Sequence, residues 1–364
     1  MKHKIGFIGL GLIGGSIAKA IRQYYPDYEI VAFDKSKESL ALATQESTID
    51  VAATTIDNNF HNCNYIFLCA PVASNTAYLK QITEYLNDDC ILTDVGSVKT
   101  NIHEEVKALG IEKYFIGGHP MAGSEKSGYS NSKAMLIENA YYILTPTSEV
   151  SQEKVDAYEH FIESLKALPI VLDYQLHDYI TGTISHLPHI IASSLVNFVK
   201  QHDTNDELMK NLAAGGFKDI TRIASSSPIM WQNICLKNKQ NIVDILDQYI
   251  DSLEDFKEAI EREDDLDLYN RFDSSRNYRN SMPASSAGPI KKSFAVYCDI
   301  IDEAGGIAAI ATILASNNIS IKNIGIIHNR EFEEGVLRIE FYDEDSSKRA
   351  VGLLQKFRYI VYER

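Results

Sequence analysis

A histidine held between glycine and proline is the first residue of this sequence that could carry out acid–base chemistry. His119 lies in residues 117–128, GGHPMAGSEKSG, directly after the apolar, strand-like residues 114–116. Such neighbours fix the backbone and leave room for another molecule to approach the ring, as the mounting of a catalytic acid or base requires. A structural histidine in a tight turn explains the same residues equally well. The choice depends on what else is positioned near this histidine.

A dinucleotide-binding fingerprint at the start of the chain favours the catalytic interpretation. A predicted strand at residues 4–8 leads into a glycine-rich turn, and a predicted helix follows at 16–21. The first glycine permits a tight turn, the second lets the backbone approach a pyrophosphate, and the third lets the helix lie close to the strand. The helix N-terminus then attracts the phosphates. The residues predicted to bind the cofactor here are Gly9, Leu10, Gly11, Leu12, Ile13 and Gly14.

The cofactor itself is predicted to be NAD. A second predicted strand, residues 29–33, leads to Asp34, at the distance from the glycines where an acidic residue binds the ribose diol. A carboxylate there also repels a 2′-phosphate, which disfavours NADP. Lys35 and Lys37 weaken this preference, although neither is the arginine typical of a strong phosphate site.

Residues 1–172 alternate predicted strands and helices, as a doubly wound, Rossmann-type α/β sheet requires. Additional strands are expected at 65–69, 90–93, 141–144 and 169–172, and a helix at 151–167. Ligands of such sheets bind beyond the carboxyl ends of the strands. The residues expected in this crevice with the nicotinamide are Ala70, Pro71, Asp94, Ser97, Lys99 and His119.

The composition is that of a multidomain enzyme in a reducing compartment. The 364 residues suffice for two or three domains, and the net charge of −15 excludes nucleic acid or an anionic membrane surface as the main partner. Five cysteines without paired spacing indicate reduced thiols. We expect neither a signal peptide nor a membrane span, and hence a cytoplasmic location.

Residues 173–285 are predicted to form an all-α domain. Helical periodicity replaces the strand pattern there, and the apolar helix faces require packing against the first domain and against a second copy of the chain. Residues 251–273 are expected to form a last helix with ten acidic and three basic side chains. A polar linker should follow at 274–289.

Three histidines near the start of this domain, His177, His186 and His189, raise the question of a metal site. On a straight helix His186 and His189 are neighbours, whereas His177 lies on the opposite side from His186. Three histidines on one straight face are therefore excluded, and no carboxylate or thiolate has suitable spacing, so we predict no metal. We expect one histidine to point into a substrate cleft and another to be hydrogen-bonded in the core.

Arg222 follows the segment GGFKDIT at 215–221 and is expected to lie among apolar residues, where an arginine needs an anionic partner. That partner is either a structural carboxylate or the carboxylate of a substrate. The residues alone leave both open.

The last domain, residues 290–364, is predicted to have the order β-α-β-β-α-β. Strands are expected at 294–298, 319–327, 335–341 and 359–362, and helices at 307–315 and 346–354. This ferredoxin-like arrangement exposes a helix face and an edge strand suited to pairing between copies.

Taken together, these motifs closely resemble the prephenate dehydrogenase family of tyrosine biosynthesis, in the form with a C-terminal ACT domain. The resemblance covers nearly the whole chain. It depends on motifs in the family's order, namely GxGxxG at 9–14, DVGSVK at 94–99, GHPMAGSE at 118–125, SHLPH at 185–189 and GGFKD at 215–219 followed by Arg222. It implies NAD-dependent oxidative decarboxylation of prephenate to 4-hydroxyphenylpyruvate by a homodimer that pairs through its helical domain.

The resemblance also assigns roles to individual residues. His119 would accept the proton of the ring hydroxyl as a neutral base, Ser97 would bridge His119, the hydroxyl and the nicotinamide, and Arg222 would hold the ring carboxylate. The pocket around the pyruvyl side chain would be lined by His189, Ser124, Glu125 and Trp231. His177 and His186 are left as structural or supporting residues.

By the same resemblance, the terminal domain is expected to bind L-tyrosine or another aromatic amino acid and to inhibit the enzyme. Its ligand residues would be Asp302, Gly305, Gly306 and Ser320. Ala304 stands where many ACT modules have proline.

Three other functions stay open. An arogenate dehydrogenase would differ only in the amino group of the substrate's side chain. A β-hydroxyacid dehydrogenase shares the first domain but should have a lysine on the helix that here has His186 and His189. A non-catalytic protein that senses NAD and an amino acid would share the first and last domains.

Overall fold

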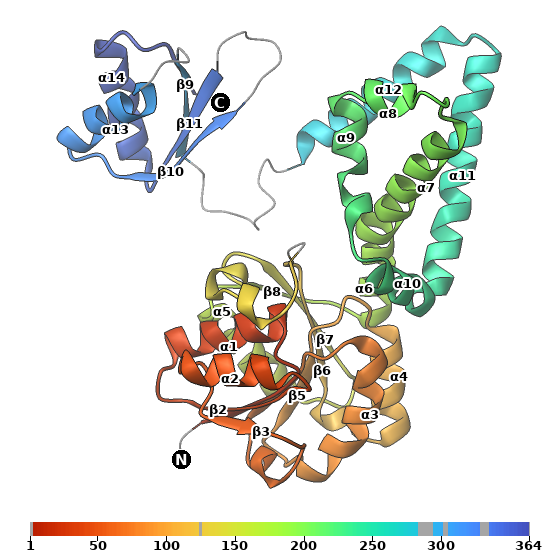
Figure 1. Ribbon diagram of the computed structural model, residues 1–364, viewed down its shortest axis with the longest axis vertical. Coiled ribbons are helices and arrows are strands. Elements are labelled where there is room, and N and C mark those ends of the chain that lie inside the picture. Colours follow the sequence, from red (N-terminus) through yellow and green to blue (C-terminus); the bar gives the residue numbers. More distant parts are fainter. Residues whose placement is uncertain (1–2, 124–125, 283–293, 301–304, 328–334, 364) are drawn as a thin grey trace. The chain divides into compact units, whose positions relative to one another are not determined.

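The computed structural model describes residues 3–123, 126–282, 294–300, 305–327 and 335–363. The chain divides into two compact units, Met1–Gly288 and Pro289–Arg364. The first unit contains an α/β domain and a helical domain, and the second contains a small α/β domain (Figure 1).

The α/β domain is built around a five-stranded parallel sheet in the order β3-β2-β1-β4-β5. Its strands are β1 (Lys4–Ile8), β2 (Glu29–Phe33), β3 (Val51–Ala53), β4 (Tyr65–Leu68) and β5 (Ile91–Asp94). The helices α1 (Leu12–Tyr24), α2 (Lys37–Gln45), α3 (Val72–Ile82) and α4 (Thr100–Leu109) connect them. The chain order reverses between β1 and β4, which is where a sheet of this kind opens a crevice for ligands.

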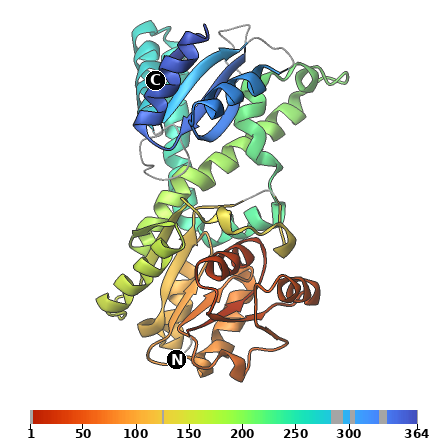
Figure 2. The same ribbon diagram turned by 90° about the vertical axis from the view of Figure 1, so that its left-hand side faces the viewer.

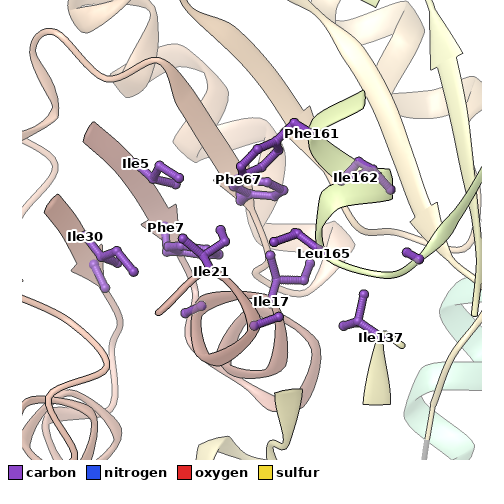
Figure 3. Packing of buried hydrophobic residues seen from close by; sticks show 14 of the residues in the cluster. Ile5, Phe7, Ile17, Ile21, Ile30, Phe67, Ile137, Phe161, Ile162 and Leu165 are labelled. Atoms are coloured by element: carbon purple, nitrogen blue, oxygen red, sulfur yellow. The ribbon is translucent and has the colours of Figure 1, made fainter. Parts of the chain in front are cut away.

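Both faces of this sheet are buried. On one face Phe7 and Phe67 stack with their ring centroids 5.0 Å apart, and Ile17 and Ile21 of α1 pack against the same cluster (Figure 3). The other face is covered by a second cluster that includes residues of α3 and α4. Because helices cover both faces, these strands consist of continuous apolar runs, and their bounds could be predicted from the sequence.

The remaining strands of this domain form a separate sheet, which corrects the expectation of a single doubly wound sheet over residues 1–172. β6 (Ile116–Pro120) is antiparallel to β7 (Tyr141–Pro146), which is parallel to β8 (Leu168–Val171) after the helix α5 (Gln152–Ser164). In the described part of the chain, one parallel bridge, Leu92 to Phe115, joins this sheet to β5.

His119 lies inside β6 and not in a turn after a strand, so that expectation is wrong. A Cβ atom on Gly118 would lie 2.6 Å from the carbonyl oxygen of Asp94. At Gly117 a Cβ would collide with Oγ1 of Thr145 on β7. The two glycines before His119 are therefore required by the close approach of β6 to its neighbours β7 and β5, and they do not form a tight turn.

The helical domain begins with α6 (Tyr174–Thr181), a π-helical turn (Gly182–His186) and α7 (Leu187–His202). Pro188, in the first turn of α7, has no N–H to continue the regular hydrogen-bond ladder, which accounts for the irregular turn before it. The other helices are α8 (Leu208–Leu212), α9 (Gly215–Thr221), α10 (Pro228–Lys237), α11 (Lys239–Glu261) and α12 (Asp265–Ser281).

Two predictions for the end of this domain are wrong. The acidic residues 251–273 belong to two helices, because the chain breaks at Glu263, whose φ is 53°. Residues 274–281, predicted as linker, continue α12, where Asp273 pairs with Arg276 and Asn277 one turn later. Most of the remaining predicted linker lies outside the described residues.

The second unit has the predicted strand and helix order. An antiparallel sheet, β10-β11-β9-β12, is formed by β9 (Phe294–Ile300), β10 (Ile321–Ile327), β11 (Gly335–Phe341) and β12 (Val361–Glu363). The helices α13 (Gly306–Ser316) and α14 (Glu344–Lys356) pack against it through Ile310, Leu314, Ala350 and Leu354. Figure 2 shows these strands, in blue, side by side.

All five cysteines are unpaired thiols in the structure. Within the ranges that the structure describes, no helix is both long enough and apolar enough to cross a membrane.

Candidate active site

His119 is the end of a hydrogen-bonded row of three side chains. Its Nδ1 atom lies 2.8 Å from Nε2 of His177, and Nδ1 of His177 lies 2.8 Å from Oδ1 of Asp178. His177 and Asp178 are fully buried at the start of the helical domain, whereas His119 is half-buried on β6. The row therefore crosses from one domain to the other.

The row determines which nitrogen of His119 is free to accept a proton. The Asp178 carboxylate only accepts hydrogen bonds, so His177 donates from Nδ1 and has a lone pair at Nε2. Nδ1–H of His119 donates to that lone pair. Nε2 of His119 is left unprotonated, as a general base requires.

The electrostatic surroundings keep the imidazole of His119 neutral. Burial holds the pKa of His119 well below the ordinary 6.5, and the nearby His177, Lys99 and His186 lower it further. Burial raises the pKa of Asp178, but the hydrogen bonds from His177 and Thr100 outweigh it and hold that pKa below its usual value. A neutral His119 is thus supported by an ionised Asp178.

Asp178 also joins the helical domain to the α/β domain. Its two oxygens accept the backbone N–H groups of Lys99 and Thr100, each at 2.8 Å. These groups belong to the N-terminus of α4, where amides have no partner within the helix and favour negative charge. One carboxylate therefore docks the two domains and orients His177.

The glycine-rich turn has the geometry expected of a dinucleotide site. Gly9 has φ 96°, and a Cβ there would lie 2.6 Å from Ala70 N, while a Cβ on Gly14 would lie 2.6 Å from Gly9 O. At Gly11 a Cβ would meet nothing within 4 Å, so the backbone faces open space. Gly11 gives α1 no side-chain cap, which leaves its first amides for a phosphate. These residues fit NAD.

Asp34 braces the same turn. One of its carboxylate oxygens accepts the N–H of Leu10 at 2.5 Å, and the other accepts the N–H of Ser36 at 2.7 Å. The side chain of Leu10 is fully buried, so only its backbone is available to a cofactor. Leu12 and Ile13 form the first turn of α1, and Ala70 and Pro71 follow β4 at the mouth of the crevice.

Asp94, predicted to contact the cofactor, is buried at the end of β5. The residue is 1% exposed, and its carboxylate oxygens bond to Nζ of Lys99 and to the backbone N–H groups of Gly96 and Gly118. Its carboxylate is therefore held by protein groups, and a cofactor contact of Asp94 stays a prediction. Ser97, in the same segment between β5 and α4, is half-buried.

A second group of predicted residues lines a cavity of about 650 Å³ in the helical domain. The rings of His189 and Trp231 stack there with centroids 3.6 Å apart. Burial lowers the pKa of His189, and the charge of Arg222 lowers it further, against a hydrogen bond with the backbone of Ile223. His186 is buried beside them, and its Nδ1 lies 3.1 Å from the amide of Asn238.

Two side chains of this domain differ from the expectations. Arg222 does not line the cavity and is exposed at the start of a short turn, so the premise of a buried guanidinium is wrong. In the described part of the molecule, the indole N–H of Trp231 is buried without an acceptor. Such a donor is available to a bound acceptor atom.

Comparison with known proteins assigns the family. The model "Prephenate dehydrogenase, nucleotide-binding domain" matches residues 17–171, and "Prephenate dehydrogenase, dimerization domain" matches residues 173–274. The chain belongs to the prephenate dehydrogenase family. It is therefore an NAD-dependent oxidoreductase of prephenate, and its first two domains are the nucleotide-binding and dimerisation domains of that family.

Individual relatives agree with this assignment. A prephenate dehydrogenase of Bacillus subtilis is 38% identical over 96% of this chain and 95% of its own length. A solved prephenate dehydrogenase of Aquifex aeolicus, in complex with hydroxyphenyl propionate and NAD+, has a TM-score of 0.73 at 32% identity and covers 78% of this chain and 99% of its own. A solved arogenate dehydrogenase of Synechocystis has a TM-score of 0.70 at 28% identity, covering 76% and 99%.

The candidate site contains residues that the sequence did not assign to it. His177 was left as a structural or supporting residue, and Asp178 received no role. The adjacent pair His-Asp was the available signal, but its meaning depends on how α6 docks against β6. Ser124 and Glu125, predicted to line the pocket, lie outside the described residues, as does Asp302. Gly305, Gly306 and Ser320 lie in the second unit, around the start of α13 and before β10.

Proposed function

We propose that His119 is the general base with which this chain oxidises prephenate and that His177 and Asp178 hold it in the reactive tautomer. The observation that supports this is the row Asp178, His177, His119, with 2.8 Å at each step and, among the described residues, no hydrogen bond at the Nε2 of His119. A neutral base next to the nicotinamide site is what removal of a hydroxyl proton needs.

The reaction balances with one base and no metal. NAD, bound at the glycine-rich turn, supplies the nicotinamide that accepts hydride from the ring carbon bearing the hydroxyl. Nε2 of His119 accepts the hydroxyl proton in the same step. The ring carboxylate then leaves as CO₂, the electron pair of its C–C bond makes the ring aromatic, and His119 returns the proton to the phenolate oxygen.

The dimerisation domain would bind the rest of the substrate. Arg222 presents a guanidinium near His189 and would pair with the ring carboxylate, as a fork with two donors suits a carboxylate. The buried indole N–H of Trp231 and the ring of His189 would face the pyruvyl side chain. Ser97, Ser124 and Glu125 are proposed to complete the pocket.

Arogenate is the alternative substrate, because a solved arogenate dehydrogenase has nearly the same fold match as the solved prephenate dehydrogenase. The test is to supply prephenate or arogenate with NAD or NADP and to follow reduced nicotinamide by its absorbance. We expect the highest kcat/KM with prephenate and NAD, and 4-hydroxyphenylpyruvate as product. No reduction with either substrate would refute an enzymatic function.

The chain is also proposed to act as a cytoplasmic homodimer. Large apolar side chains are concentrated on the exposed surface of the dimerisation domain, for example Phe198, Leu212, Ile229 and Leu236, which are 58–78% exposed. Such a surface in one protomer requires a covering partner. Sedimentation or light scattering should therefore give twice the mass of one chain.

The C-terminal unit is proposed to be an ACT-type regulatory domain that binds L-tyrosine. Its βαββαβ order and its sheet with both helices in one apolar cluster support this. Deletion of residues 290–364 should abolish inhibition by tyrosine and leave the basal reaction intact. The same inhibition in the shortened protein would contradict the regulatory role.

A further inference from the structure

A buried ion pair next to the base has no part in the reaction described above. Lys99 is 0% exposed and Asp94 is 1% exposed. Nζ of Lys99 lies 2.6 Å and 2.5 Å from the two carboxylate oxygens of Asp94. Burying two charges is costly, and close pairing offsets the cost only when further hydrogen bonds satisfy both groups.

The further hydrogen bonds of this pair converge on the residue before His119. Nζ of Lys99 donates to the carbonyl oxygen of Gly118 at 2.6 Å, and the N–H of Gly118 donates to Oδ1 of Asp94 at 3.1 Å. Both backbone groups of Gly118 are thus held by the ion pair. The backbone that carries His119 is fixed at the adjacent position.

The ion pair connects β5 and β6 near His119, where backbone hydrogen bonds between these two strands are missing. β6 is hydrogen-bonded to β7 along one edge, and residues of such a strand alternately direct their backbone groups to the other edge. On that other edge, as far as the structure describes it, only the bridge from Leu92 to Phe115 connects β6 with β5. Near His119 the connection is made by the side chains of Asp94 and Lys99.

Lys99 is connected to the ring of His119 by a second route. Its backbone N–H donates to Oδ1 of Asp178 at 2.8 Å, and the same oxygen receives Nδ1–H of His177. Lys99 therefore contacts both supports of the base, the backbone through Gly118 and the ring through Asp178 and His177.

We propose that Lys99, paired with Asp94, is a positioning residue that holds His119 on β6 with its Nε2 directed at the substrate hydroxyl. This inference rests on the proposed role of His119 as base. Lys99 contacts neither substrate nor cofactor in this role, and it acts through Gly118 and Asp178.

Because Lys99 is charged, its effect can also be measured through the pKa of His119. The groups that face the His119 ring are His177 from α6, His186 from the π-helical turn and Lys99 from the segment before α4. Asp178 lies behind His177, and Asp94 is paired with Lys99. Burial lowers the pKa of His119 most, and the positive charge of Lys99 lowers it further. Loss of the lysine charge should therefore raise that pKa towards its ordinary value.

The experiment uses the double variant Lys99→Met, Asp94→Asn in the full-length enzyme, because a single neutral substitution leaves the partner charge buried alone. We expect kcat with prephenate to fall about 10²-fold, since a misplaced base is costly, while KM and the Kd of NAD change less than about twofold. The acid limb of kcat/KM should move to higher pH. A matched control is Lys113→Met, Asp88→Asn, which removes an exposed pair of the same domain at 3.0 Å and should change nothing.

His119→Asn in the same assay distinguishes a failure of the role proposed for Lys99 from a failure of the role proposed for His119. If His119→Asn is inactive but the double variant keeps the wild-type kcat and pH profile, the proposed role of Lys99 is wrong. The assignment of His119 as base would then still stand. Full activity of His119→Asn would instead overturn the proposed function. Lys99→Gln, Asp94→Asn is the second variant, because it leaves no charge buried alone and its glutamine amide can still donate to Gly118. It should show a smaller loss of kcat with the same shift of the acid limb, and no change in either would contradict the proposal even if the first double variant did not fold.

Discussion

Nδ1 of His119 and Nε2 of His177 lie 2.8 Å apart, although the first residue belongs to the nucleotide-binding domain and the second to the dimerisation domain. The tautomer of the base therefore depends on how the two domains dock. Asp178 fixes this docking, because its carboxylate accepts the first amides of α4 as well as the proton of His177. The proposed base is thus supported from both domains.

The orientation of His177 can be tested by Asp178→Asn. An asparagine can present its N–H to His177, which favours the opposite tautomers along the row, so we expect kcat to fall about 10²-fold or more. Asp173→Asn is the control, since Asp173 caps the same helix through Gln175 and Leu176 and asparagine caps equally well. Initial rates with saturating prephenate and NAD provide the measurement. Equal rates in the two variants would show that the row does not orient the base.

Substrate binding by Arg222 predicts a different kinetic signature. Arg222→Lys keeps the charge but loses the fork that binds a carboxylate with two hydrogen bonds, so KM for prephenate should rise about tenfold or more. Lys218→Arg, one turn earlier on α9, is exposed and should leave KM unchanged. An unaltered kcat/KM in Arg222→Lys would assign the arginine to a structural role.

Substitutions at two glycines of the cofactor turn distinguish an effect on stability from an effect on NAD binding. Gly14→Ala places a methyl group 2.6 Å from Gly9 O and should reduce the free energy of unfolding by about 1–3 kcal/mol. Gly11→Ala meets nothing within 4 Å and should leave the melting temperature nearly unchanged. It should nevertheless weaken NAD binding, because the methyl group occupies the approach of the pyrophosphate. Calorimetry of both variants, and titration with NAD, distinguish the two effects, and normal NAD affinity in Gly11→Ala would contradict this placement of the cofactor.

The sequence predicted the strands that are buried on both faces and missed what depends on contacts between distant segments. β1 and β2 have the predicted bounds because continuous apolar runs end at glycine or a charged residue. The sequence pattern predicts a turn at Gly117 and Gly118, since only the folded structure shows that Thr145 and Asp94 leave no room for their side chains.

In the candidate site, too, local motifs could be predicted and contacts between distant segments could not. His119 and the glycine turn could be found from local motifs. His177 could not be joined to His119, because the two are brought together by the docking of α6 and not by sequence spacing. The place of Asp94 at a strand end predicts a cofactor contact, but its pairing with the buried Lys99 could not be predicted, because the two side chains meet only in the folded structure.

Three histidines with lowered pKa values predict a loss of stability in acid. Burial lowers the pKa of His103 and His186 from 6.5 to about 4, and that of His119 well below 6.5. Each histidine thus binds its proton more readily in the unfolded chain, so stability is present above the unfolded pKa and decreases as pH falls from 6.5 towards 4. His103 and His186 each contribute up to roughly 3 kcal/mol. Thermal melts across this interval should show a steadily falling midpoint, and a constant midpoint would contradict the burial of neutral histidines.

The central claim is that neutral His119 removes the hydroxyl proton, and its most direct test is the pH dependence of kcat/KM for prephenate in the wild-type enzyme and in His119→Asn. Because the pKa of His119 is well below 6.5, the wild-type rate should fall only on strongly acid titration, as one proton binds. The variant should lose this limb, and its kcat should be about 10² to 10⁴-fold lower with the Kd of NAD unchanged. A variant with wild-type kcat, or with the same acid limb as the wild type, would show that another group is the base.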